Sequence, residues 1–203
     1  YLYKTGIHHP LRDKIIDTTD IQLSNVIPRI TGPVPMKKKI WFQKHMAQHI
    51  LSETDLNWIN KVENCILIRN PKEVILSYQK KYKINSIEQL GYPQLTKIYN
   101  LLCNINQCNP IIIDAKDILI NPKKILKLLC NKLSIPFLNE MLKWPSGPRE
   151  TDGIWGEHWY NNVVSTTTFQ PYVSNDNPIP IKYKSLFDSC MEHYQQYYSH
   201  RLQ

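Results

Sequence analysis

Long hydrophobic runs are missing from this sequence of 203 residues. No apolar stretch approaches the roughly 18 residues that a helix needs to cross a bilayer, so we expect no membrane span. The 5 cysteines form an odd number and include no Cys-x-x-Cys pair. Several of them fall within apolar segments, which favours reduced thiols and a cytoplasmic location.

The sequence also lacks zinc-finger spacing and any recognisable RNA-binding signature, so we expect no nucleic-acid partner. Acidic residues are scarce, with 17 Asp and Glu against 25 Lys and Arg, which gives a net charge of +8. Such an excess indicates an anionic partner, for example a nucleotide, sulfate or acidic lipid. Because the lysines form only short runs, at 37–39 and 80–83, a solvated basic surface is the better explanation of the charge.

Three segments have the composition of β-strands. Residues 65–68 and 110–114 are short apolar runs bounded by turn residues, and residues 39–44 are a further candidate. Helical periodicity or capping signals follow in segments that begin at 71, 87, 122 and 182. Strands that alternate with helices predict an α/β fold with a parallel sheet flanked by helices. We expect residues 1–203 to form one domain, with a short helical start over 1–17 and a surface loop over 18–36.

Arg69 and Ser77 bracket the start of the first of these helices. Arg69 follows a predicted strand, and open α/β sheets bind ligands at the carboxyl ends of their strands. Asn70 and Pro71 suit the N-cap and the first helical position, and Glu73 is available as the reciprocal capping partner. A guanidinium and a hydroxyl two turns later can bind one phosphate, although the same residues also suit a plain strand–turn–helix junction.

This pattern resembles the 3′-phosphate-binding motif of the sulfotransferase family, whose members use the donor 3′-phosphoadenosine 5′-phosphosulfate (PAPS). Two later segments are also similar to the family. One is the helix that starts at Asn121-Pro122 and ends near Ser134, where serine replaces the expected glycine. The other is the tryptophan-rich stretch 144–160, which is similar to a segment in a bacterial-type branch of sulfotransferase-like proteins. Together with residues 1–9 and 43–51, it makes the resemblance cover most of the chain.

The resemblance implies a three-layer parallel sheet of the P-loop NTPase-like sulfotransferase type. It places Arg69 and Ser77 on the 3′-phosphate of PAPS and Arg149 elsewhere on the nucleotide. The tryptophan-rich stretch is then either a lid over the nucleotide or acceptor, or a loop anchored by its aromatic side chains.

A phosphate loop of the Pro-Lys-Ser-Gly-Thr-Thr type, which family members carry on their first strand, does not occur in this sequence, and neither does GxxxxGK[ST]. Since that loop precedes the equivalent of Tyr1, we expect the chain to be truncated before Tyr1 and to lack the first strand and phosphate loop of the fold. The chain as given is then expected to bind PAPS poorly and to turn over little.

Lys44, His45 and His49 are the catalytic candidates. Sulfuryl transfer needs a base and a cationic group and no metal. In the family a lysine and a histidine two residues later supply these groups. Here Lys44 matches the lysine, but Met46 occupies the histidine position, so the base is expected to be His45 or His49. The His45 and His49 pair also has helical zinc-site spacing, but the glutamate of such sites is Met46 here and a third ligand is missing.

The leading hypothesis is a sulfotransferase-like protein that moves a sulfuryl group from PAPS to a hydroxyl or amine of a small molecule or biopolymer. One alternative is another P-loop-type nucleotide- or phosphate-binding enzyme, such as a kinase, which would require Mg²⁺. A second is a non-catalytic binding protein that retains the fold. The sequence identifies neither the acceptor nor the oligomeric state.

Overall fold

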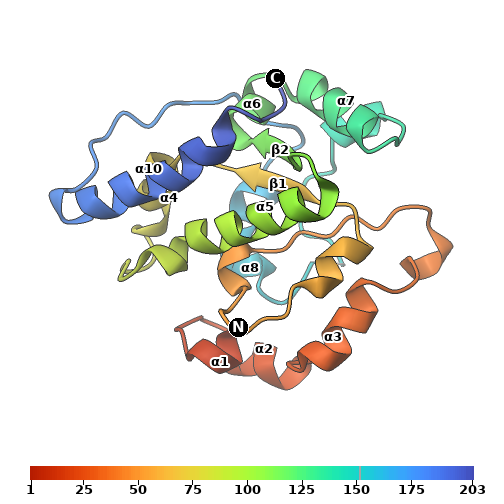
Figure 1. The fold of residues 1–203 in the computed structure, drawn as a ribbon, viewed down its shortest axis with the longest axis horizontal. Coiled ribbons are helices and arrows are strands. Elements are labelled where there is room, and N and C mark those ends of the chain that lie inside the picture. The colour runs from red at the N-terminus through yellow and green to blue at the C-terminus, as the bar shows by residue number, and fades with distance from the viewer. Residues whose placement is uncertain (151) are drawn as a thin grey trace.

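Two parallel strands lie at the centre of the protein, surrounded by helices (Figure 1). The computed structural model describes residues 1–150 and 152–203. Strand β1 (Cys65–Ile68) pairs with β2 (Ile111–Asp114), with Cys65 opposite Ile111 and Ile68 opposite Asp114. Both strands and their parallel pairing were predicted from the sequence. The described part of the chain is therefore a helix-rich α/β structure with a small parallel sheet.

The connection between the two strands consists of α4 (Pro71–Tyr78), the 3₁₀ turn η4 (Ile87–Leu90) and α5 (Tyr92–Asn106). After β2 come α6 (Ala115–Ile120) and α7 (Pro122–Lys132). Asn70 and Asn121 both act as N-caps, because their side chains accept hydrogen bonds from Lys72 N and Lys124 N. The predicted Asn-Pro helix starts are thus confirmed.

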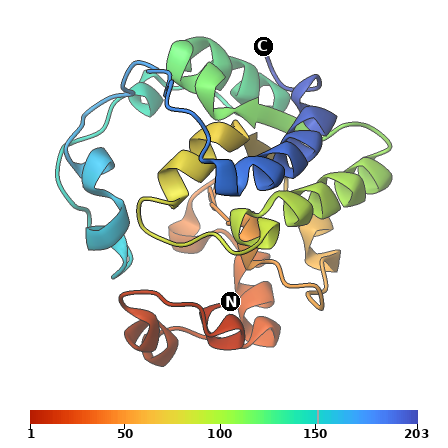
Figure 2. The same ribbon diagram turned by 90° about the vertical axis from the view of Figure 1, so that its left-hand side faces the viewer.

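The remaining elements are short, apart from the last helix. They are α1 (Leu2–Thr5), α2 (Arg12–Thr18), α3 (Leu23–Ile30), η1 (Pro35–Lys37), η2 (Ala47–His49), η3 (Asn57–Lys61), η5 (Asn139–Leu142), α8 (Gly156–Trp159), α9 (Asn161–Val164), η6 (Ile181–Tyr183) and α10 (Lys184–Tyr198). Helices α1 to α3 lie together at one end of the molecule, and α7 lies at the other (Figures 1 and 2). Among the described residues, no helix combines the length and apolar character that a membrane crossing requires.

The main core lies on one face of the sheet, where α5 and α10 pack against the strands. Ile66, Ile68 and Ile112 contribute from the strands, and they meet a set of buried side chains from the helices: Tyr92, Tyr99, Leu102, Cys190, Tyr194 and Tyr197. Helices α8 and α9 lie on the opposite side of the strands (Figure 2). They do not cover β1 there, because Leu67 remains 55% exposed. One face of the small sheet is therefore well packed and the other is open at β1.

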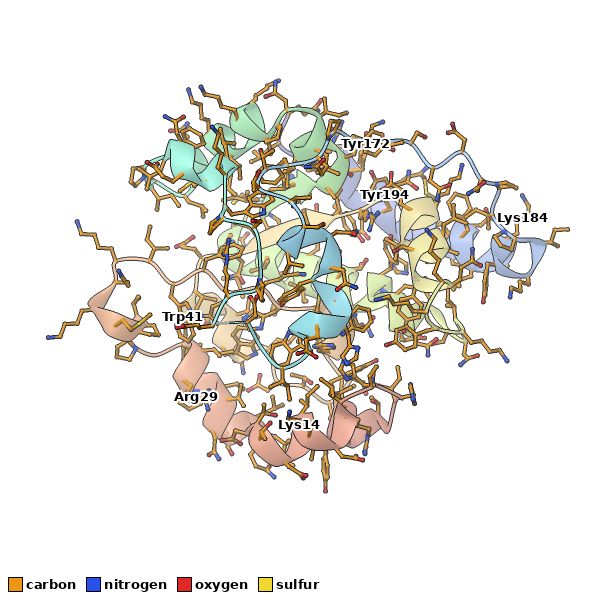
Figure 3. The ribbon with its side chains drawn as sticks, turned by 180° about the vertical axis from the view of Figure 1, so that it is seen from behind. Lys14, Arg29, Trp41, Tyr172, Lys184 and Tyr194 are labelled. Carbon is orange, nitrogen blue, oxygen red and sulfur yellow. The ribbon has the colours of Figure 1, made fainter. Side chains whose placement is uncertain are left out.

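Two sequence predictions were wrong in this part of the chain. Residues 39–44 form no strand, because the segment is irregular and has no strand paired with it among the described residues. Its Gln43 side chain instead donates to Ile30 O (2.8 Å), and Trp41 lies beside α3 in Figure 3. The expected loop 18–36 contains α3, which continues through Pro28 and is closed by the bond from Thr31 N to Ile27 O. A proline removes one donor from a helix, and here the remaining bonds suffice.

The chain terminus returns to the sheet after α10. Leu202 N donates to Ile112 O of β2 (2.9 Å). Arg201 Nε donates to Asp117 Oδ2 (2.8 Å), and its guanidinium lies over the Tyr198 ring at 3.7 Å. The last residues are thus attached to β2 and α6.

Candidate functional site

The junction between β1 and α4 fixes the backbone of Arg69. Asn70 caps the helix with its side chain, and Pro71 occupies the first helical position. The buried Tyr92 donates its hydroxyl hydrogen to Arg69 O (2.9 Å). Arg69 is therefore held at the carboxyl end of β1, as the sequence predicts.

The Arg69 side chain forms an ion pair with Glu73, one turn later on α4. Arg69 Nε donates to Glu73 Oε2 at 3.0 Å, and the side chains are 50% and 15% exposed. Glu73 was expected to cap the helix reciprocally, and that expectation was wrong. The carboxylate instead accepts from the Arg69 guanidinium.

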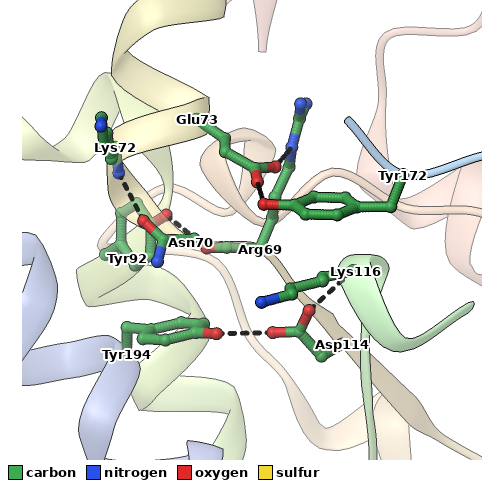
Figure 4. Close-up of polar contacts among 9 residues, drawn as sticks. All are labelled: Arg69, Asn70, Lys72, Glu73, Tyr92, Asp114, Lys116, Tyr172 and Tyr194. Atoms are coloured by element: carbon green, nitrogen blue, oxygen red, sulfur yellow. Dashed lines mark hydrogen bonds and ion pairs between the residues drawn. The ribbon is translucent and has the colours of Figure 1, made fainter. Parts of the chain in front are cut away.

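Tyr172, from the long segment between α9 and η6, completes this group. Its hydroxyl donates to Glu73 Oε1 at 2.7 Å, and that bond is the main reason why the pKa of Tyr172 is raised. Lys116 Nζ, just after β2, lies 5.2 Å from the centre of the Tyr172 ring. Tyr172 therefore lies between the ends of the two strands (Figure 4).

The end of β2 carries a buried carboxylate. Asp114 is only 2% exposed and accepts two hydrogen bonds, from Lys116 N (2.7 Å) and from the Tyr194 hydroxyl (2.6 Å). A buried carboxylate requires such donors, since an unpaired one would be costly. Asp114 could be singled out in the sequence as a polar residue that ends an apolar strand. Tyr172 could not, because it lies 99 residues from Glu73 and no local pattern marks it.

Ser77 lies on α4, two turns after the Arg69 junction, and its side chain is exposed. The structure thus places Ser77 and Arg69 on one strand–helix unit. Their joint contact with a phosphate stays a prediction.

Lys44 and His45 lie in the irregular segment before η2, and both are exposed. The His45 ring packs near Trp58 at 5.6 Å, and its Nε2 donates to Gln43 Oε1 (3.2 Å). That bond leaves Nδ1 as the unprotonated nitrogen of the neutral ring. Partial burial lowers the pKa of His45.

His49 ends η2 and stacks on Tyr1, with ring centres 4.6 Å apart. Its pKa is lowered to about 4, mainly by desolvation. Tyr1 also lies close enough to Tyr78, the residue after Ser77, to contribute to the raised pKa of its hydroxyl.

The segment after Lys44 contains only the three-residue η2, so the helical spacing of His45 and His49 does not place them on one helical face. The backbone of η2 packs closely against Gly91. The φ of Gly91 is +81°, and a Cβ at this residue would lie 3.0 Å from Gln48 N. Only glycine suits both the backbone conformation and this close approach. In the described ranges, no cluster of three His, Cys, Asp or Glu side chains is arranged to hold a metal.

Arg149 lies in the predicted tryptophan-rich stretch, and its side chain is exposed. Its backbone N donates to Asp152 Oδ2 (2.9 Å). Residues near it are bonded to α9 and to the chain that follows, from Gly147 N to Val164 O and from Trp144 N to Thr167 O. Thr151 in this stretch lies outside the described residues. No hydrogen bond or ring contact of the described residues joins Arg149 to Arg69 or to His45.

The aromatic side chains of the same stretch contact the end of α4 and the N-terminal segment. Lys81 Nζ donates to His158 O (2.8 Å) and lies 4.3 Å from the centre of the Trp159 ring. Trp159 Nε1 donates to His9 Nε2 (3.2 Å). Because Trp159 is 41% exposed, it is only partly buried by these contacts. The structure therefore favours neither the lid nor the simple anchor for this stretch.

Comparison with known proteins gives one family and two relatives. A family model described as a sulfotransferase domain matches residues 1–200. Branched-chain-amino-acid aminotransferase-like protein 2 of Arabidopsis thaliana is 31% identical over 194 residues, and protein 1 of the same name is 30% identical over 200 residues. The matches cover 96% and 98% of this chain but only 34% and 36% of the relatives, so the chain spans about a third of their length. No solved structure gives a significant match.

Proposed function

Because the chain belongs to the sulfotransferase family, we propose that it transfers a sulfuryl group from PAPS to a hydroxyl or amine acceptor. The observation that carries the proposal is the placement of Arg69. Its backbone is fixed at the carboxyl end of β1, and half of its side chain is exposed. Ligands of open α/β sheets bind at this end of the strands. A guanidinium there suits a phosphate, because its fork of N–H groups matches two phosphate oxygens.

The proposed donor site consists of Arg69 and Ser77 on the 3′-phosphate, with Arg149 on the remainder of the nucleotide. The exposed side chains of all three residues fit this role. When bound, PAPS supplies an activated sulfuryl group. Arg69 neutralises the charge of the 3′-phosphate. Ser77 adds a hydrogen-bond donor of fixed direction, which favours a phosphate in one position over a loosely bound anion.

The three-layer sheet with a phosphate loop on its first strand is part of the same proposal. The exposed Leu67 on β1 supports it, because a strand residue of that kind is usually covered by a further layer. In this proposal the described residues supply the 3′-phosphate side of the donor site.

On the acceptor side, we assign Lys44 to the charge that develops on the transferring group and a histidine to the acceptor proton. Both His45 and His49 are neutral at pH 7, since their pKa values are lowered. A base works best when its pKa lies near the operating pH. His49, whose pKa is about 4, meets this requirement poorly. His45 has an unprotonated Nδ1 that can accept the acceptor proton, so we assign it as the base.

The five cysteines are free thiols, and Cys130 and Cys190 are buried. This supports a reducing, cytosol-like compartment for the protein, as its sequence suggests. The hydroxyl or amine acceptor and the sulfuryl-transfer activity belong to the same proposal.

Calorimetry with the product nucleotide 3′-phosphoadenosine 5′-phosphate, on the intact gene product that contains this domain, tests the donor site. We expect Arg69→Ala to weaken binding at least tenfold, about 1.4 kcal/mol. Arg29→Ala, which removes an exposed arginine from α3, is the matched control for the loss of one positive charge and should leave binding unchanged. Equal binding of ADP, or no response to Arg69→Ala, would contradict the proposal.

Transfer itself is tested with radiolabelled PAPS and separate panels of phenols, sugars and amines. Label incorporation that needs no Mg²⁺ and falls in His45→Gln would support sulfuryl transfer with His45 as the base. Phosphoryl transfer from ATP with Mg²⁺ would instead identify the kinase-like alternative. Nucleotide binding without any transfer would identify the non-catalytic alternative.

A further inference from the structure

We propose that Glu73 and Tyr172 are positioning residues that aim the terminal nitrogens of Arg69 at the 3′-phosphate. This inference rests on the proposed function and extends it to two residues outside the donor motif. Neither residue is expected to touch the nucleotide. Each acts through Arg69, by the chain of contacts from Tyr172 Oη to Glu73 and from Glu73 to Arg69 Nε (Figure 4).

The first step is the choice of nitrogen. Glu73 Oε2 accepts from Arg69 Nε at 3.0 Å, and this is the ion-pair contact between the two side chains. A guanidinium has five N–H groups, and the four on its two terminal nitrogens form an end-on fork. Binding at Nε therefore fixes the plane of the group while the fork stays available to an anion. The 50% exposure of the Arg69 side chain is consistent with an accessible fork.

The second step is the immobilisation of Glu73. An exposed ion pair between residues four apart on a helix contributes only a few tenths of a kcal/mol and moves freely. Glu73 differs, because its side chain is only 15% exposed and its second oxygen accepts from Tyr172 at 2.7 Å. With both oxygens occupied, the carboxylate has one orientation.

The third step is the attachment of Tyr172 to the other strand. Its ring lies 5.2 Å from Lys116 Nζ, which follows β2, so the tyrosine lies between groups from both strand ends. The raised pKa of its hydroxyl keeps the proton in place at neutral pH, and the hydroxyl remains a donor to Glu73. The segment before η6 thereby reaches the donor site without supplying a ligand.

A competing role for Glu73 makes the opposite prediction. If the carboxylate only competed with the phosphate for Arg69, its removal would tighten nucleotide binding. If it positions Arg69, its removal weakens binding even though a nearby negative charge is lost. Tyr172→Phe is the sharper variant, because it removes one hydroxyl and changes no charge.

The experiment compares 3′-phosphoadenosine 5′-phosphate with adenosine 5′-phosphate, by calorimetry on the intact gene product. The ratio of the two affinities isolates the 3′-phosphate contact. We expect Tyr172→Phe to lower this ratio about fivefold, the scale of coupling within one hydrogen-bonded network, with adenosine 5′-phosphate binding unchanged. Glu73→Gln should lower it as well. In an Arg69→Ala background the Tyr172→Phe effect should vanish.

Tyr3→Phe, at an exposed tyrosine of α1, is the matched control and should leave the ratio unchanged. Thermal unfolding of each variant separates a loss of folding stability from a loss of Arg69 positioning. A ratio that falls in Arg69→Ala but not in Tyr172→Phe would overturn the positioning role and leave the proposed function intact. Tighter binding in Glu73→Gln would also overturn it. A wild-type protein that does not distinguish the two nucleotides would overturn the proposed function itself.

Discussion

The Tyr194 hydroxyl donates a 2.6 Å hydrogen bond to Oδ2 of Asp114, and this bond joins the last helix to the end of β2. Both residues are buried, and Asp114 Oδ1 is occupied by Lys116 N. The carboxylate that ends β2 is thus fully engaged in holding the fold. Arg69, at the end of the neighbouring strand, is an exposed charged group at the same edge of the sheet.

Tyr194→Phe should destabilise the protein by about 1–3 kcal/mol, because it leaves a buried carboxylate oxygen without its donor. Urea unfolding followed by circular dichroism measures the change. Tyr198→Phe, one turn later on the same helix, is the control and should have a much smaller effect. Equal stability of Tyr194→Phe and the wild type would show that water replaces the lost hydroxyl.

Asn70→Ala and Asn121→Ala should each lower the free energy of unfolding by about 1 kcal/mol, since each removes an N-cap hydrogen bond. Asn104→Ala makes the same chemical change inside α5, where alanine is the better helix former, and should be neutral or slightly stabilising. Thermal and urea unfolding of the three variants checks the difference in sign. Losses of the same size in all three would mean that capping is not the cause.

Ser134→Gly should stabilise the protein by roughly 0.5–1 kcal/mol. Ser134 has a φ of +52°, a left-handed conformation that closes α7 through the bond from Ile135 N to Cys130 O (2.9 Å). Glycine adopts this conformation without the Cβ clash. Ser199→Gly, at a φ of −66° after α10, is the matched control and should destabilise. Differential scanning calorimetry distinguishes the two, and a lower midpoint for Ser134→Gly would contradict the argument.

The His49 ring should titrate at about pH 4 in the folded protein. Its folded pKa lies below the value of 6.5 for an unperturbed histidine, so the unfolded state takes up the proton first as the pH falls. The free energy of unfolding should therefore decrease between about pH 6.5 and pH 4, and His49→Asn should flatten that decrease.

NMR of the histidine ring protons measures the His49 titration directly, and urea unfolding across the same pH range measures the linkage. A ring titration centred near 6.5 would show that the contact with Tyr1 does not desolvate the imidazole. The same result would make His49 as suitable a base as His45.

Local patterns were sufficient for the units built from neighbours in the chain. The strand, Asn cap and proline before α4 follow one another within seven residues, and Asn121 and Pro122 start α7 with the same Asn-Pro pair. Ser134 was identified as the position of a missing glycine, and it has the left-handed conformation that a glycine would adopt. In each of these units the hydrogen bonds join residues that are close in the chain, so the local sequence is sufficient to predict the backbone conformation.

Contacts between distant segments could not be predicted in the same way. The sequence suggested a backbone amide as the partner of Glu73. In the structure its carboxylate accepts from Arg69 and from the hydroxyl of Tyr172, which lies 99 residues away in the chain. The segment 39–44 has a strand composition, but a strand exists only with a paired neighbour, and composition does not supply one. Ser77 was correctly placed on its helix, whereas Lys44 lies in the irregular segment that was expected to be a strand. The joint action of Lys44, His45, Ser77 and Arg149 remains a prediction.

The bond from Leu202 N to Ile112 O bears on how the protein behaves in concentrated solution. A two-stranded sheet exposes backbone amides and carbonyls along its outer strands, where another polypeptide can add itself. At β2 Leu202 occupies one of these groups, and the ion pair between Arg201 and Asp117 holds this segment in place. The segment after α10 therefore shields part of the outer edge of β2 from pairing with another polypeptide.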